Sequence, residues 1–120
     1  MSKKNIVEIT NEGQTAVVAF KETSITDTET IAAVQKQIVD FIDANQPQSI
    51  VVDFENVKFF ASQLLGMLLG VRAKLQQYDG RVVISAIDPR LHKIFNITNL
   101  DKIFDFFPDK DSAVSAAGRA

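Results

Sequence analysis

Two short, unbroken apolar runs constrain the fold of this chain more than any other feature of its sequence. They are SIVVDF at residues 49–54 and RVVISA at residues 81–86, and both are rich in β-branched residues. Strands that are buried on both faces of a parallel sheet have this composition, because helices cover the two faces. The runs therefore predict two central strands of a parallel sheet.

Three further segments are strand candidates. Residues 5–10 and 15–20 carry β-type residues, and turn-forming residues 11–14 separate them. This arrangement predicts an antiparallel hairpin. The segment KIFDFF at residues 102–107 is the last strand candidate.

Helical spacing of apolar residues fills the gaps between these strands. Thr26 and Glu29 form a capping-box pattern that predicts the start of the first helix, and Pro47 ends it. A second helix is predicted from about Ser62 to Gln77, with Gly80 as the left-handed residue that follows its end.

Two shorter helices complete the pattern. Pro89 suits the first turn of the helix PRLHKIFNI, and a terminal helix is predicted to begin near Asp109 or Asp111. The resulting order, β-β-α-β-α-β-α-β-α, is typical of an α/β domain with a mixed, mostly parallel sheet of about five strands and about four helices. We expect one domain over residues 1–120, with its core at about 5–115.

Composition excludes several classes of function. Hydrophobic residues make up 46% of the chain, and thirteen basic against fifteen acidic residues give a net charge of −2. This balance does not suit binding to nucleic acid or to anionic membranes. The apolar run LLGMLLGV has eight residues, whereas a membrane span needs about 20. No secretory signal opens the chain, so we expect a cytoplasmic protein.

The residues needed for common enzyme chemistry are missing. The chain has no cysteine and a single histidine, His92, which rules out thiolate and polyhistidine metal sites and predicts an ordinary helix residue. No phosphate-binding glycine motif or nucleophile elbow is present. Asp53, at the end of a predicted central strand, resembles the phosphate acceptor of a receiver domain. It lacks the neighbouring carboxylates that Mg²⁺ needs, so a role in satisfying backbone groups of the loop is favoured. We expect neither an enzyme nor a cofactor.

Ser62 and the helix after it leave two interpretations open. Ser62 could be the N-cap of this helix, or it could be a site of modification at an interaction surface. Gly66 and Gly70 share one side of the helix with Met67, opposite a core face at Leu64, Leu68, Val71 and Leu75. A glycine inside a helix costs about 1 kcal/mol relative to alanine, so two of them suggest that another surface approaches closely. That surface could belong to this chain or to a partner.

The same region resembles the STAS domain of anti-sigma-factor antagonists. DFENVKF at residues 53–59 is similar to the family strand D-[LF]-x-x-V-x-F, and FASQLLG at residues 60–66 is similar in part to [IM]-D-S-[ST]-G-L-G. The stretch LQQYDGRVVISAIDPRLHKIFNITNLDKIFDFF also matches the family's strand, its proline-led helix and its T-x-L-x-K-[IL]-F ending. The resemblance extends over roughly residues 5–115.

The resemblance implies a phosphorylation switch. In such antagonists an anti-sigma-factor serine kinase phosphorylates the first serine of the motif, and a phosphatase of the PP2C type resets it. The unphosphorylated form binds the kinase and frees the sigma factor. That serine corresponds to Ser62, and no cofactor belongs to the domain itself. We therefore expect the kinase to bind at the residues around Ser62, namely Ala61, Ser62, Gln63, Gly66, Met67 and Gly70.

Three departures from the motif leave alternatives open. Ala61 replaces the family aspartate, Gln63 the second hydroxyl residue and Leu64 the glycine. One alternative is a constitutive STAS scaffold subunit of a stress-signalling or transporter-associated complex, without phosphorylation. A further alternative is the binding of a nucleotide or other small molecule. The oligomeric state and the identity of the partner are not predicted.

Overall fold

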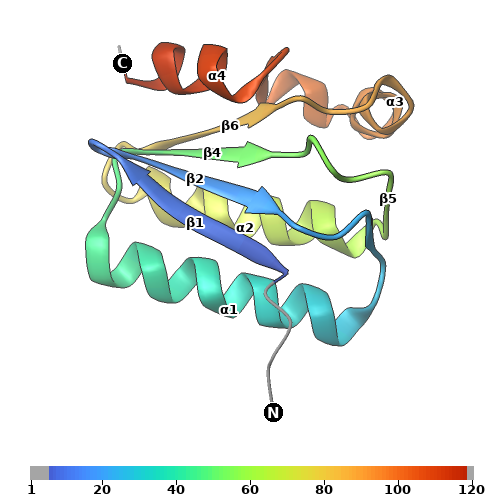
Figure 1. Cartoon of the computed structure of the whole chain (residues 1–120), viewed down its shortest axis with the longest axis horizontal. Helices are drawn as coiled ribbons and strands as arrows, with labels where there is room; N and C mark the ends of the chain where they lie inside the picture. The colour runs from blue at the N-terminus through green and yellow to red at the C-terminus, as the bar shows by residue number, and fades with distance from the viewer. Residues whose placement is uncertain (1–5, 119–120) are drawn as a thin grey trace.

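A five-stranded sheet forms the centre of the computed structural model, which describes residues 6–118 (Figure 1). The strand order is β1-β2-β4-β6-β7; β1 is antiparallel to β2 and the other neighbours are parallel. The bounds are β1 Val7–Glu12, β2 Thr15–Phe20, β4 Ser49–Asp53, β6 Arg81–Ser85 and β7 Asp105–Phe107. The predicted mixed, mostly parallel α/β fold with four α-helices is confirmed.

The two apolar runs occupy the centre of this sheet, as predicted. In β4, Ile50 and Val52 join the core under one face, while Val51 joins a smaller cluster on the other face. Every residue of β4 is buried. A central strand with both faces covered therefore needs a continuous run of apolar residues rather than alternating apolar and polar residues.

Four helices cover the sheet. Helices α1 (Thr28–Asn45) and α2 (Gln63–Gln76) lie side by side on one face, and α4 (Lys110–Ala117) lies on the opposite face (Figure 1). Helix α3 (Pro89–Ile97) contributes Leu91 and Phe95 to the larger core. Within residues 6–118, no helix combines the length and apolarity needed to cross a membrane.

The predicted starts of α1 and of the last strand are wrong. Helix α1 is capped by Asp27 rather than Thr26, because the Asp27 carboxylate accepts the Thr30 backbone N–H at 2.8 Å and the Thr30 hydroxyl at 2.7 Å. The predicted strand 102–107 begins late, since residues Leu100–Lys102 form a 3₁₀ turn and only Asp105–Phe107 pair with β6. The predicted first residue of the hairpin, Asn5, lies outside the described residues.

The predicted role of Gly80 at the end of α2 is also wrong. The left-handed residue after α2 is Asp79, with φ of 63°, not Gly80. Gly80 is required for close packing instead, since a Cβ there would lie 3.0 Å from the Gln48 carbonyl oxygen and 3.1 Å from Leu75 Cβ. Its N–H donates to the Leu75 carbonyl at 2.8 Å and closes the end of the helix.

A second, two-stranded sheet was not predicted from the sequence. It pairs β3 (Ser24–Ile25) in parallel with β5 (Phe59–Phe60). Two residues are too few to produce a recognisable hydrophobic pattern. In the chain β3 lies between β2 and α1, and β5 lies between β4 and α2, so their pairing positions the loop that leads to Ser62.

Candidate functional site

The loop that leads to Ser62 begins with an anchored carboxylate. Asp53 is 7% exposed and accepts hydrogen bonds from the Glu55 backbone N–H (3.1 Å) and the Ser85 hydroxyl (3.3 Å). Asp53 therefore satisfies loop and strand groups, as the sequence favoured. No group of three or more histidine, aspartate or glutamate residues that could hold a metal occurs in residues 6–118. The receiver-domain interpretation of Asp53 gains no support from this geometry.

Buried apolar residues hold the first half of the loop in place. Phe54 is fully buried and packs edge-to-face against Phe20 (ring centroids 5.3 Å apart), Phe60 (6.0 Å) and Phe95 (6.5 Å). Val57 is also fully buried. The D-F-x-x-V spacing of the sequence thus has a structural cause, because Asp53 fixes the turn and the two apolar side chains fix the loop on the core.

Backbone hydrogen bonds fix the second half of the loop. The N–H groups of Lys58 and Phe59 both donate to the Thr23 carbonyl, at 2.7 and 3.1 Å, and the Ala61 N–H donates to the Ile25 carbonyl at 3.0 Å. The approach to Ser62 is therefore tied at three points to the segment that follows β2.

Ser62 does not cap helix α2 with its side chain. Its backbone is already helical, with φ −57° and ψ −22°, and its hydroxyl makes no capping hydrogen bond. The Leu64 N–H donates to the Ala61 carbonyl (2.9 Å) and the Leu65 N–H to the Ser62 carbonyl (3.0 Å). These short 3₁₀-type hydrogen bonds use backbone N–H groups of the first turn. A capping hydroxyl would otherwise accept hydrogen bonds from those groups. The Ser62 side chain is exposed, and although Ser62 occupies the N-cap position, the predicted hydrogen bond from the helix to its hydroxyl is absent.

The two neighbours of Ser62 differ in their roles. The Gln63 side chain accepts a hydrogen bond from the Thr28 hydroxyl at 3.1 Å, which links the first turns of α2 and α1. Ala61 is half-buried and packs against the main core. No acidic side chain lies in the first turn of α2, so the partial positive charge at this end of the helix is not neutralised there.

The two glycines of α2 have different surroundings. A Cβ on Gly66 would have no neighbouring atom within 4 Å, whereas a Cβ on Gly70 would lie 3.7 Å from Gln35 Nε2 of helix α1. One turn further along, Lys74 pairs with Asp43 of α1 at 2.7 Å. The approaching surface at Gly70 is therefore part of this chain, while the surface beside Gly66 is open.

The prediction that Met67 lies on the open side of α2 is wrong. Met67 is 3% exposed and belongs to the main core, as does Leu65. Helix α2 packs against both the sheet and helix α1, so its buried arc is wider than the single core face that the periodicity suggested. Met67 is therefore not available to a partner in this structure, in contrast to the sequence-based expectation.

Phe59 is an exposed residue near Ser62 that the sequence did not predict as part of the site. Phe59 is 61% exposed, although it lies between buried Val57 and half-buried Phe60. Residues alternate between the two faces of a strand, and Phe60 points inward to Phe54 and Phe95. Phe59 consequently points outward. Strict alternation through VKFF would instead have placed Phe59 on the same face as buried Val57, so this local pattern does not predict its exposure.

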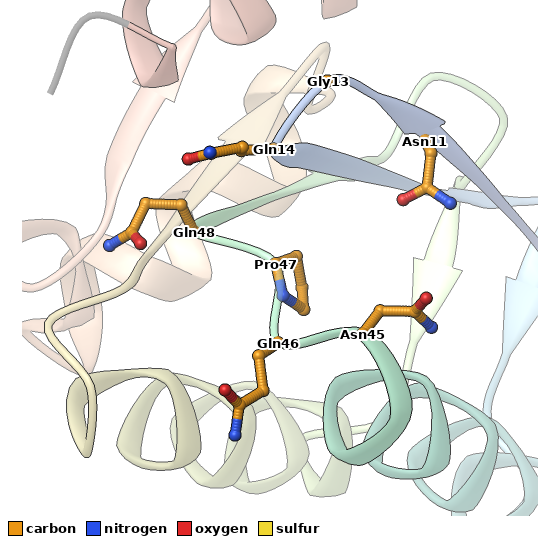
Figure 2. A pocket seen from close by; sticks show the side chains of 7 residues that line it. All are labelled: Asn11, Gly13, Gln14, Asn45, Gln46, Pro47 and Gln48. Atoms are coloured by element: carbon orange, nitrogen blue, oxygen red, sulfur yellow. The ribbon is translucent and has the colours of Figure 1, made fainter.

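A hollow lies at the other end of the molecule from Ser62 (Figure 2). About 520 Å³ in volume, it is formed by the β1–β2 turn, the end of α1 and the start of β4, at Asn11, Gly13, Gln14, Asn45, Gln46, Pro47 and Gln48. None of these seven side chains is charged or aromatic, so they offer neither a cation for a phosphate nor a ring for a nucleobase. His92 is likewise a packing residue, with its ring edge-to-face on Phe106 at 4.5 Å.

The structure is thus an α/β domain in which Ser62 is exposed at the start of α2. The STAS domain profile matches residues 8–113 of the chain. This protein therefore belongs to the STAS domain family, as the motif resemblance indicated.

Individual relatives agree with this assignment. The chain is 24% identical over 109 residues to the anti-sigma F factor antagonist of Paenibacillus polymyxa, with 91% of this chain and 93% of the relative covered. The structure of an anti-sigma factor antagonist from Mycobacterium paratuberculosis has a TM-score of 0.80 at 27% identity and 92% coverage of both chains. The unphosphorylated form of the antagonist SpoIIAA has a TM-score of 0.84 at 18% identity, with 95% and 97% covered. SpoIIAA of Bacillus has also been solved in its phosphorylated form.

Proposed function

We propose that this protein is an anti-sigma-factor antagonist that acts in the cytoplasm. It binds an anti-sigma-factor serine kinase when Ser62 carries a free hydroxyl, and it releases the kinase when Ser62 is phosphorylated. A phosphatase of the PP2C type restores the binding form. The chain itself performs no catalysis and needs no cofactor, since the kinase supplies ATP.

The observation that carries this proposal is that the Ser62 hydroxyl is exposed and makes no capping hydrogen bond. The Ser62 side chain is exposed at the start of α2, and its hydroxyl is not used to cap the helix. A kinase can therefore reach the hydroxyl without unwinding the helix. The anchored loop on one side and the first turn of α2 on the other present it in a fixed position.

The electrostatics of α2 allow phosphorylation without loss of the fold. A phosphate adds about −1.5 to −2 charge at neutral pH, and a helix N-terminus favours an anion. Since the first turn of α2 holds no acidic side chain, the phosphate meets no like charge within that turn. At a docked interface the same charge is desolvated and repelled by acidic groups, so one modification dissolves the complex and spares the domain.

The substitution of the family aspartate by Ala61 is compatible with this role. Ala61 holds the loop through its backbone, with its N–H bonded to Ile25 and its carbonyl to Leu64. Neither contact depends on a carboxylate. Supporting the proposal further, two relatives at 24% and 27% identity are named antagonists of anti-sigma factors.

The test is a reconstitution with the anti-sigma-factor kinase of the same host. Purified wild-type chain, Ser62→Ala and the matched control Ser115→Ala are incubated with the kinase and Mg-ATP, and phosphate is located by mass spectrometry. Ser115 is also an exposed serine, but it lies in α4. We expect phosphate on wild type and Ser115→Ala and none on Ser62→Ala. Equal modification of all three chains would refute the assignment of the site.

Binding is measured on the same proteins by calorimetry. Unmodified wild type is expected to bind the kinase, and the phosphorylated form to bind at least 100-fold more weakly. A chain that is never phosphorylated and yet occurs in a large assembly, insensitive to kinase and ATP, would instead support a constitutive scaffold.

A further inference from the structure

We propose that Phe59 is the apolar anchor of the kinase-binding surface, and that it enters an apolar pocket of the kinase whose rim carries carboxylates. This inference rests on the proposed function and specifies the partner surface that it requires. Phe59 is the last residue of the segment that resembles the family strand, and it precedes Ser62 by three residues.

Phe59 stands out among the exposed side chains. Within residues 6–118, the exposed large apolar residues are Phe59, Ile97 and Ile103, at 61%, 80% and 40%. Single exposed apolar residues are common and need no partner. Phe59 differs from the two isoleucines in its position, because three residues of chain span at most about 11 Å and so keep it beside Ser62.

The backbone of Phe59 is held rigidly. Its N–H donates to the Thr23 carbonyl at 3.1 Å, and the adjacent Lys58 N–H donates to the same oxygen at 2.7 Å. The following residue, Phe60, is locked into the core against Phe54 and Phe95. An aromatic side chain on a fixed backbone loses little conformational entropy when a partner covers it, which is the property of an interface hot spot.

The surface around Phe59 is shaped for a partner. Gly66 lies one helical turn after Ser62, and a side chain there would have open space around it. Phe59 precedes Ser62 in the chain, and the missing side chain of Gly66 leaves backbone accessible one turn after it. A partner can accommodate the ring in a pocket and place its own side chains over Gly66.

The charge around this surface indicates the chemistry of the partner's rim. Lys58 is half-exposed, and its Nζ makes a long ion pair with the Asp88 carboxylate at 4.0 Å. The Asp88 carboxylate is already bound by Arg90, through its Nε at 3.3 Å and its terminal nitrogen at 3.2 Å. Lys58 thus remains able to pair with another carboxylate, and the helix N-terminus adds partial positive charge. Carboxylates on the partner would attract this surface and would repel a phosphate on Ser62.

The inference is tested by calorimetry with the same kinase. We expect Phe59→Ala to weaken binding about 30-fold, or about 2 kcal/mol at 1.4 kcal/mol per tenfold. The matched control is Ile97→Ala, which removes a more exposed apolar side chain from α3. It is expected to bind within twofold of wild type. Phe59→Tyr keeps the ring and should bind within threefold. Lys58→Ala should weaken binding about fivefold at low salt and less at high salt.

The outcomes separate this inference from the function on which it rests. If wild type binds the kinase and Phe59→Ala binds within threefold of it, the anchor assignment alone is overturned. If wild type does not bind the kinase at all, both proposals fail. Thermal melting of each variant is recorded first. Because the side chains of Phe59 and Ile97 are exposed, we expect melting temperatures within about 2 °C of wild type.

Discussion

Replacing Gly66 by alanine should stabilise the fold and weaken the complex at once. Gly66 lies in the first half of α2, and an added Cβ would meet no atom of this chain within 4 Å. The substitution therefore brings no steric cost within the domain. It removes the conformational entropy that a glycine loses on folding, and it adds a methyl group to the surface that we assign to the kinase.

The size of the effect follows from the position. An alanine in an exposed helix interior is favoured over glycine by about 1 kcal/mol. With an unfolding entropy of about 2.1 cal/mol/K per residue, a chain of 120 residues should gain about 4 °C in melting temperature. Kinase binding should weaken by about tenfold, because the methyl group has to be accommodated in a packed interface.

Gly70→Ala is the matched control. Its Cβ would make an ordinary van der Waals contact with Gln35 Nε2 at 3.7 Å, so a similar stabilisation is expected. Because its neighbour is helix α1 of the same chain, kinase binding should be unchanged. Differential scanning calorimetry gives the stabilities and titration calorimetry the affinities. A stabilised Gly66→Ala that binds as tightly as wild type would refute the assignment of this face, and a destabilised one would refute the open surroundings of Gly66.

Further predictions concern Gly80, Ser62 and the aspartates that cap α1 and α4. Gly80→Ala should destabilise the fold by about 1–3 kcal/mol in urea unfolding, because its Cβ would lie 3.0 Å from the Gln48 carbonyl oxygen; an unchanged midpoint would contradict this packing. Ser62→Ala should change stability by less than about 0.5 kcal/mol, whereas the loss of a true cap would cost about 1 kcal/mol. The pKa of Asp27 is lowered by hydrogen bonds from Thr30, and that of Asp109 by hydrogen bonds from Ser112. The stability that these two carboxylates contribute is fully present above the ordinary aspartate pKa near 4, and it is lost as the pH falls through their lower pKa values in the folded state. The urea concentration at the unfolding midpoint should therefore decrease once the pH is below about 4. This decrease should be less steep for Asp27→Asn.

Several features of the fold could be predicted because a local pattern determines them. Continuous apolar runs identified β4 and β6, and Pro89 marked the start of α3. For α4 the sequence offered Asp109 or Asp111, and the structure has Asp109 as the cap. These signals depend on neighbouring residues only. The resemblance of the motif around Ser62 added the family, which the profile match over residues 8–113 confirms.

The features that were missed depend on contacts distant in sequence or on backbone conformation. Met67 is buried because α1 covers a second side of α2, and no periodicity within α2 reveals that neighbour. Ser62 resembles a capping residue in sequence, but its backbone is helical. The N–H groups of the first turn therefore donate to backbone carbonyls instead of to the Ser62 hydroxyl. The parallel pairing of β3 with β5 joins segments about 35 residues apart, and it decides that Phe59 points outward.

The most direct test of the central claim is a phosphopeptide map of the protein isolated from its native host during growth and under stress. The account predicts phosphate on Ser62, with an occupancy that changes between the two conditions. A Ser62 that is unmodified in both conditions, with full coverage of its peptide, would contradict the switch.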